Sequence, residues 1–214
     1  MITIYGYPRS RSGRATWMME ELGQDYTFTL VDLHKGGGNA AEFLAINPAG
    51  KVPALQDDDV VITESGAIVT YLGDKFGNRE LVPEPGTPLR GKYEQWCYFA
   101  TTELEQPLWT MGKHKFAIPE EHRVKEIFPT AGWEFQKALD IFSRGLGDNP
   151  YILGDHFSAA DILLTHTLFW GLMFEQPVNQ DNLKAYLDRI STRPALQRMR
   201  EREQKALDSA AADE

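Results

Sequence analysis

The sequence has little cysteine, because Cys97 is the only one among 214 residues. A single cysteine cannot form a disulfide within its own chain, and this composition favours a reducing compartment. No run of about 20 apolar residues, the length of a membrane-spanning helix, is present. The first residues also lack the basic and then apolar pattern of a secretory signal. We therefore expect a cytoplasmic protein with no membrane partner.

The sequence also lacks a basic excess, since 22 Lys and Arg residues stand against 31 Asp and Glu. The formal net charge of −9 would repel a phosphate backbone, so no nucleic-acid partner is expected. The histidines show no metal-ligand spacing, so no metal is expected. No glycine-rich segment ends in the Gly-Lys-Ser/Thr of a phosphate-binding loop, and no Gly-x-Ser-x-Gly hydrolase elbow occurs.

Basic side chains are instead concentrated in residues 5–14, Tyr-Gly-Tyr-Pro-Arg-Ser-Arg-Ser-Gly-Arg, which we name the Ser10 turn. Alternating apolar residues before it predict a strand, and the apolar stripe over residues 15–22 predicts an amphipathic helix. The hydroxyls of Ser10 and Ser12 would then lie beside the positive end of a helix dipole. Such a turn suits an anion or a thiolate. An ordinary helix N-cap is the alternative interpretation.

The remaining pattern predicts two domains. Strands are expected over residues 26–31, 52–55 and 60–62, and helices over 40–46 and from Glu64 onward. Pro53 is unusual in a strand, because proline cannot donate to a ladder and belongs at an edge, a strand start or a cis bond. The Pro- and Gly-rich segment 77–87 predicts a linker, and nothing after it has a strand pattern. We expect an α/β domain over residues 1–76 and an all-helical domain over residues 88–214.

The helical half begins with a long apolar stripe over residues 89–108, which also carries Cys97 as a packing residue. A second face of the same helix carries Phe99, Trp109 and Lys113. The next helix is expected over residues 124–142, with a bend at Pro129.

A capping box is predicted further on, with Ser158 as the cap and Asp161 three residues later. The helix that it starts is apolar nearly all round and should be buried. Two more helices are expected over residues 182–191 and 194–207. Residues 208–214 are expected to form a polar, frayed tail.

Four motifs in this order and spacing resemble those of the cytosolic glutathione transferases, and the resemblance covers essentially the whole chain. They are the segment 10–17, the segment 47–55 (Asn-Pro-Ala-Gly-Lys-Val-Pro-Ala-Leu), the pair Glu64-Ser65, and the Ser158…Asp161 box. The turn is most similar to serine-type bacterial and fungal members, which are theta-, delta- or tau-like. The resemblance implies a thioredoxin-like α/β domain followed by an all-α domain, the glutathione transferase fold.

The resemblance also implies a glutathione site. Val52 matches the residue before the family's cis-proline, which is Pro53 here, and its backbone would pair with the cysteinyl part of glutathione. Glu64 and Ser65 match the acid–hydroxyl pair that holds the γ-glutamyl ammonium and carboxylate. The glycine carboxylate needs a cation, and three are within reach: His34, Lys35 and Lys51.

The reactive species would be the glutathione thiolate, because a thiol of pKa about 8.5 is only about 3% ionised at pH 7. Ser10 is the candidate hydrogen-bond donor to this thiolate, Ser12 is the second candidate, and Arg14 would add positive charge. The substrate pocket is expected to include Tyr7, Phe99, Trp109 and Lys113.

The function expected from this resemblance is a glutathione S-transferase that attacks small hydrophobic electrophiles, with glutathione as co-substrate and a homodimer as the assembly. Two alternatives remain. One is a glutathione-dependent peroxidase, isomerase or disulfide reductase on the same site. The other is a non-catalytic interaction module of the same fold.

Overall fold

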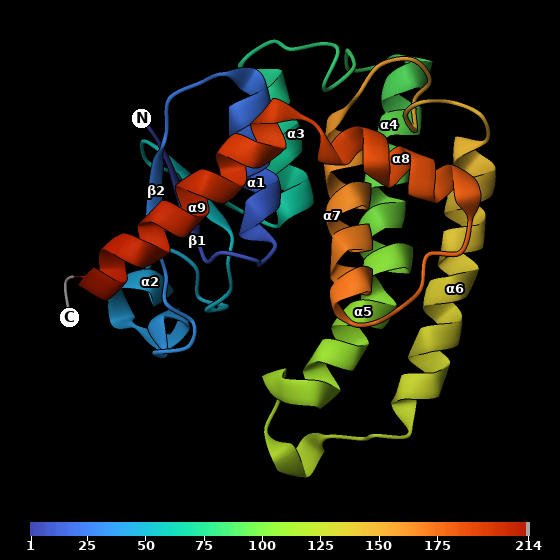
Figure 1. The fold of residues 1–214 in the computed structure, drawn as a ribbon. Helices are drawn as coiled ribbons and strands as arrows, with labels where there is room; N and C mark the ends of the chain where they lie inside the picture. The colour runs from blue at the N-terminus through green and yellow to red at the C-terminus, as the bar shows by residue number, and fades with distance from the viewer. Residues whose placement is uncertain (213–214) are drawn as a thin grey trace. The chain divides into compact units, whose positions relative to one another are not determined.

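The structure is a computed structural model that describes residues 1–212 (Figure 1). The strands are β1 (Ile2–Gly6), β2 (Thr27–Leu30), β3 (Ala54–Asp57) and β4 (Val60–Thr63). The α-helices are α1 (Ser12–Leu22), α2 (Ala41–Leu44), α3 (Ser65–Lys75), α4 (Pro88–Phe99), α5 (Glu105–Gly112), α6 (Ile127–Leu146), α7 (Ala159–Met173), α8 (Asp181–Ser191) and α9 (Pro194–Ala212). The chain divides into a first unit, residues 1–79 with the residues from 191 onward, and a second unit, residues 80–190.

The first unit contains a mixed sheet in the order β2-β1-β3-β4. β1 is parallel to β2 and antiparallel to β3, and β3 is antiparallel to β4. Ile2 and Ile4 are buried while Thr3 and Tyr5 are partly exposed, as the alternation predicts. α1 packs against β1, α3 and α9. This sheet and the helical second unit confirm the predicted fold class.

The expected strand at residues 52–55 is wrong at its start, because β3 begins only at Ala54. Val52 and Pro53 precede the strand, and the peptide bond between them is cis. A proline has no N–H to donate to a ladder, so its exclusion from β3 follows from its chemistry.

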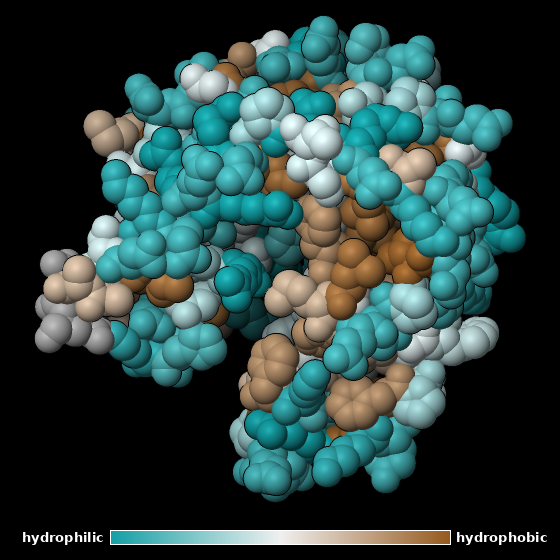
Figure 2. Space-filling model, viewed as in Figure 1, coloured by the Kyte–Doolittle hydropathy of each residue, from teal (hydrophilic) through white to brown (hydrophobic). Residues whose placement is uncertain are grey.

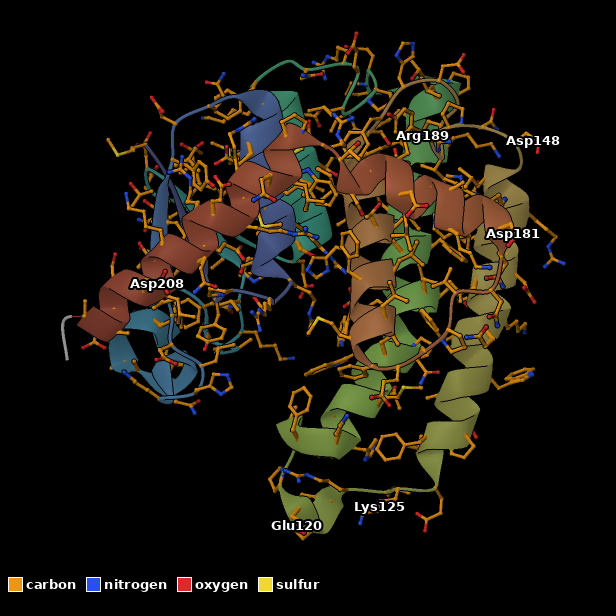
Figure 3. All side chains as sticks on the ribbon, in the orientation of Figure 1. Glu120, Lys125, Asp148, Asp181, Arg189 and Asp208 are labelled. Atoms are coloured by element: carbon orange, nitrogen blue, oxygen red, sulfur yellow. The ribbon has the colours of Figure 1, made fainter. Side chains whose placement is uncertain are left out.

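Helix α9 is longer than expected and corrects the predicted frayed tail. Asp208 lies on this helix (Figure 3) and accepts a 2.8 Å hydrogen bond from the side chain of Gln204. The alanines of residues 206–212 are strong helix formers, which the polar character of the segment obscured. Residues 213 and 214 lie outside the described residues.

Helix α9 is docked on α1 and β2 within the first unit. Ion pairs join the two helices, since Arg198 and Arg202 each approach Glu20 at 2.9 Å. Arg193 makes two 2.7 Å bonds to Glu21. The sequence assigned this helix to the all-helical half, whereas its contacts group it with the sheet.

The second unit is helical, and its first helix is interrupted where the sequence predicted one continuous helix. α4 ends at Phe99, a π-helical segment covers Ala100–Leu104, and α5 follows. Pro107 in α5 has no N–H for the carbonyl one turn earlier, and a wider turn just before it accommodates that loss. A second π-helical segment covers Lys113–Ala117.

Pro129 lies in the first turn of α6. An N–H there has no partner within the helix, so the predicted reason for a bend does not apply. The connection before α6 carries Glu120 and Lys125 (Figure 3). Figure 2 shows exposed apolar surface on this unit, whose exposed side chains include Trp133, Leu172 and Met173.

The predicted capping box is present at the start of α7. The Asp161 carboxylate is fully buried and accepts four hydrogen bonds of 2.8–2.9 Å. The donors are the N–H of Ile152, the N–H and hydroxyl of Ser158, and the hydroxyl of Tyr186. Cys97 on α4 is buried, as predicted, and burial raises its thiol pKa to about 12.

Candidate functional site

The Ser10 turn leads from the end of β1 into α1 and is held by its own backbone. The N–H of Ser10 donates to the carbonyl of Tyr7 at 3.2 Å, and Arg9 between them has a left-handed φ of 61°. Arg11 occupies the cap position of α1 and makes no side-chain cap bond. The turn therefore presents Ser10 at the N-terminal end of α1, where a helix dipole favours negative charge.

Ser12 ties the start of α1 to the end of β1. Its side chain is fully buried, and its hydroxyl donates to the Tyr7 carbonyl at 2.9 Å and accepts from the Tyr7 N–H at 3.1 Å. A Cβ on Gly6 would lie 2.6 Å from the Cβ of Ser12, so only glycine allows this approach. Ser12 therefore has a structural role in the turn.

Ser10 differs from Ser12 because its side chain is partly exposed. Its hydroxyl oxygen accepts a 3.2 Å bond from the Ser12 N–H and lies 2.9 Å from the Ser12 hydroxyl. The Ser12 proton is directed to Tyr7, so Ser10 is the donor within this pair. Because Ser10 is partly exposed, a ligand at the turn could take its proton in place of the Ser12 oxygen, while the Ser12 proton bonds to the Tyr7 carbonyl.

Arg14 connects α1 to the start of α3. Its guanidinium is fully buried and donates to the Ser65 hydroxyl at 3.0 Å. The structure thus brings two of the predicted regions, the turn and the Glu64-Ser65 pair, into direct contact. The resemblance implied separate roles for Arg14 and Ser65, and their hydrogen bond was not predicted.

Glu64 has a strained backbone, with a φ of 66° that a residue with a side chain adopts rarely. It occupies the cap position of α3 but makes no side-chain cap bond, and its side chain is exposed. The plain helix-cap interpretation therefore does not explain Glu64. Strain of this kind is often found at ligand sites.

Val52 packs against Val31, Phe43 and Ala54, with Tyr5 and Tyr7 at the edge of this cluster. Within residues 1–212, the backbone N–H of Val52 donates no hydrogen bond and its C=O accepts none. An extended peptide could pair with such groups as an added strand.

The three predicted cations lie on exposed loops. The Asp32 carboxylate accepts the N–H groups of His34 at 3.0 Å and of Lys35 at 3.2 Å, which fixes that loop. The His34 ring meets Tyr7 edge-on, with ring centroids 5.3 Å apart. Burial, followed by the Asp32 charge, raises the pKa of Tyr7.

The loop that carries His34 and Lys35 meets the segment that carries Lys51. A Cβ on Gly50 would lie 2.7 Å from the Gly38 carbonyl oxygen, and one on Gly38 would lie 2.6 Å from the Gly50 carbonyl oxygen. Small residues here let the two backbones approach. Gly38 and Gly50 therefore serve packing, a role that the sequence did not show.

The other expected pocket residues, Phe99, Trp109 and Lys113, belong to the second unit, whereas Tyr7 belongs to the first. Phe99 lies 5.1 Å from Trp96 and Trp109 lies 6.5 Å from Trp170, measured between ring centroids. A cavity of about 280 Å³ within the second unit is lined by Met111, Lys115, Phe128, Phe174 and Gln176, none of which the sequence singled out.

Neither a metal centre nor a membrane span is found within the described part of the chain. No group of three or more His, Cys, Asp or Glu side chains in residues 1–212 could hold a metal ion. No helix in the same range is both long enough and apolar enough to cross a membrane.

The mixed sheet, the serine turn before α1 and the cis Val52–Pro53 bond define a thioredoxin-like domain joined to an all-α unit. The profile of the glutathione S-transferase N-terminal domain matches residues 1–74, and that of the C-terminal domain matches residues 106–194. Glutathione S-transferase GstA from Escherichia coli O157:H7 is 31% identical over 182 residues, which cover 84% of this chain and 87% of the relative. The chain belongs to the glutathione S-transferase family.

Two further relatives extend this comparison. A crystal structure of a glutathione transferase from Methylococcus capsulatus superposes with a TM-score of 0.84 at 31% identity, covering 95% of this chain and 99% of the other. The disulfide-bond oxidoreductase YfcG from Escherichia coli K12 is 30% identical over 169 residues, which cover 76% of each chain.

Proposed function

We propose that this protein is a serine-type glutathione S-transferase in which the Ser10 hydroxyl stabilises the glutathione thiolate. The observation that carries the proposal is the difference between the two serines of the turn. The Ser12 proton is held by the Tyr7 carbonyl, whereas the partly exposed Ser10 hydroxyl is at the N-terminal end of α1. The relatives named glutathione S-transferase and glutathione transferase support the reaction class.

The energy required is within reach of this turn. Lowering the pKa of a thiol from about 8.5 to about 6.5 raises its ionised fraction at pH 7 from about 3% to about 75% and takes about 2.7 kcal/mol. A hydrogen bond to a charged group contributes about 1.5–3 kcal/mol. A helix N-terminus adds about 0.3–1 kcal/mol. Ser10 and α1 together could therefore supply the shift, with Arg14 contributing positive charge from its buried position.

The rest of glutathione would extend along the edge of the sheet. The Val52 backbone would pair with the cysteinyl residue, beside Pro53. Glu64 would hold the γ-glutamyl ammonium, and Ser65 with the start of α3 would hold its carboxylate. The cations for the glycine carboxylate are His34, Lys35 and Lys51. The Arg14–Ser65 hydrogen bond supports this arrangement, because it joins the thiol end of the site to the γ-glutamyl end.

The reaction would be attack of the thiolate sulfur on an electrophilic carbon of a small hydrophobic substrate. A carbon–sulfur bond forms, and the leaving group departs with the electron pair of its bond to carbon. Tyr7, Phe99, Trp109 and Lys113 are the residues that we assign to the second substrate. We also propose a cytoplasmic location and a homodimer, whose mass in light scattering would be twice the 24.2 kDa of one chain.

Disulfide reduction is the second candidate, because one relative is named a disulfide-bond oxidoreductase. Glutathione thiolate would attack the substrate disulfide, releasing one thiolate and forming a mixed disulfide. A second glutathione thiolate would then release the other substrate thiolate and leave oxidised glutathione. Both electrons come from the two glutathione molecules, since the only cysteine of the chain is buried in the second unit.

Two measurements test the proposal. The protein should be retained on immobilised glutathione and eluted by free glutathione, which a non-catalytic interaction module without a glutathione site would fail to do. Rates should then be compared for an activated aryl halide, a hydroperoxide and a mixed disulfide. Turnover of the aryl halide supports transfer, whereas turnover of the disulfide alone would favour the second candidate.

A further inference from the structure

Glu203 on α9 is a buried carboxylate that the proposed reaction does not use. Its side chain is 4% exposed and continues the core-facing stripe of Ala195, Leu196 and Met199. An apolar residue is the usual choice at such a helix position. Burying a carboxylate is costly unless polar groups compensate it, so its partners identify its task.

The groups that face the Glu203 carboxylate come from both sides of the Ser10–Ser12 pair. The Thr16 hydroxyl donates to a Glu203 carboxylate oxygen at 2.8 Å, and Thr16 is itself fully buried. The backbone N–H of Arg9 faces the same carboxylate and lowers its pKa. Arg9 directly precedes Ser10 and has the left-handed φ of 61°. Glu203 therefore faces the chain both just before Ser10 and one helical turn after Ser12.

The docking of α9 on α1 does not depend on Glu203. Arg198 and Arg202 pair with Glu20, and Arg193 pairs with Glu21, all toward the end of α1 that is distant from Ser10. These ion pairs would hold the two helices together around an apolar residue at position 203. The carboxylate thus adds something that docking alone does not require, which is an acceptor for the Thr16 hydroxyl beside the Arg9 N–H.

We propose that Glu203 is a positioning residue, which holds the Ser10 hydroxyl at the place of the glutathione sulfur by fixing Arg9 and Thr16. This inference rests on the proposed role of Ser10. The last helix of the chain would then influence the ionisation of bound glutathione without touching it.

The test compares the pKa of the bound glutathione thiol, read from thiolate absorbance at saturating glutathione, in a set of variants. Glu203→Leu fills the buried position with an apolar side chain and removes the carboxylate. It should raise the thiol pKa by about one unit and lower kcat/KM for the electrophile at pH 7 about threefold. Glu203→Gln keeps an acceptor oxygen and should restore most of the wild-type pKa. Arg198→Ala, the matched control, removes one ion pair of α9 and should leave the thiol pKa unchanged while lowering the thermal midpoint.

Ser10→Ala separates this inference from the proposed function. If Ser10→Ala leaves the thiol pKa unchanged, the proposed role of Ser10 is wrong and positioning by Glu203 is wrong with it. If Ser10→Ala raises the pKa and Glu203→Leu does not, only the inference on Glu203 is overturned. Adding Glu203→Leu to Ser10→Ala should cause no further shift, because the two residues act through one hydroxyl.

If Glu203→Leu does not fold, Thr16→Val tests the same hydrogen bond from its other side. Valine has nearly the shape of threonine and removes the hydroxyl that meets Glu203. The same direction of shift in thiol pKa is expected, with glutathione affinity within about twofold of wild type, since Thr16 is buried behind the turn. A wild-type thiol pKa in this variant would overturn the inference.

Discussion

The hydroxyl oxygens of Ser10 and Ser12 lie 2.9 Å apart, but their protons have different destinations. The Ser12 proton goes to the Tyr7 carbonyl, and Ser10 donates within the pair. Sequence alone allowed either serine to meet the glutathione sulfur. The geometry favours Ser10, because its hydroxyl is partly exposed and can turn from Ser12 to a ligand, whereas the Ser12 hydroxyl is fully buried and holds the Tyr7 carbonyl.

The first prediction compares these two serines. Ser10→Ala should raise the pKa of bound glutathione by about one to two units, because it removes one hydrogen bond to a charged group worth about 1.5–3 kcal/mol. Its rate should fall at pH 7 and recover as pH rises. Ser12→Ala should instead lower the free energy of unfolding by about 1–3 kcal/mol, since it leaves two partly buried backbone groups of Tyr7 without their partner. Thiolate absorbance and denaturant unfolding distinguish the two effects, and a larger thiol shift in Ser12→Ala would reverse the assignment.

Glu64→Ala should weaken glutathione binding by about one to two orders of magnitude, since a charge-assisted hydrogen bond is worth about 1.5–3 kcal/mol. The KM for the electrophile should change little, because Glu64 would face only the γ-glutamyl ammonium. Calorimetry with glutathione measures the effect. Glu134→Ala on α6 is the control, since Glu134 is another exposed glutamate. An unaltered dissociation constant for Glu64→Ala would leave its strained backbone without a ligand role.

Asp161→Ala should lower the free energy of unfolding by about 3 kcal/mol while leaving glutathione affinity unchanged in the folded protein. The substitution leaves four buried donors without their acceptor, which costs more than the loss of an exposed cap. Asp188→Ala on α8 is the matched control, because Asp188 is exposed. Unchanged stability together with lost glutathione affinity would place Asp161 in the binding site.

Glu203→Gln should remove a pH dependence of stability. Burial raises the pKa of Glu203 from 4.5 to about 7, so between these values the folded protein binds a proton more readily than the unfolded chain. Stability from this group is therefore greatest near the lower value and falls as pH rises toward 7, by on the order of 3 kcal/mol in total. Thermal unfolding at about pH 5 and about pH 8 should show a smaller loss in Glu203→Gln than in wild type. Equal losses in both proteins would assign the pH dependence to other groups.

The sequence was sufficient for the fold class because hydrophobic period changes from two to 3.6 at the Ser10 turn and no strand pattern follows residue 76. The sequence was insufficient where a contact joins residues that are far apart along the chain. Glu203 and Thr16 are 187 positions apart, and nothing in the local pattern of either points to the other. The Arg14–Ser65 bond is of the same kind, with 51 positions between its partners.

The length of α9 was also missed, for a different reason. Charge and polarity suggested a frayed tail, but the alanines favour helix and the ion pairs to Glu20 and Glu21 hold the helix on α1. Within the helical half, the apolar stripe was correct and the continuity was wrong. The spacing of apolar residues does not reveal a single π-helical turn, because the apolar face of the helix continues after that turn.

The burial of Cys97 has a practical consequence for a protein whose proposed substrates are electrophiles that react with thiolates. With a thiol pKa of about 12 and little exposure, Cys97 stays protonated and out of reach of alkylating reagents at neutral pH. The protein should therefore withstand the electrophiles that it processes instead of being inactivated by them. Any ultraviolet signal from a thiolate that titrates near neutrality can then be assigned to glutathione.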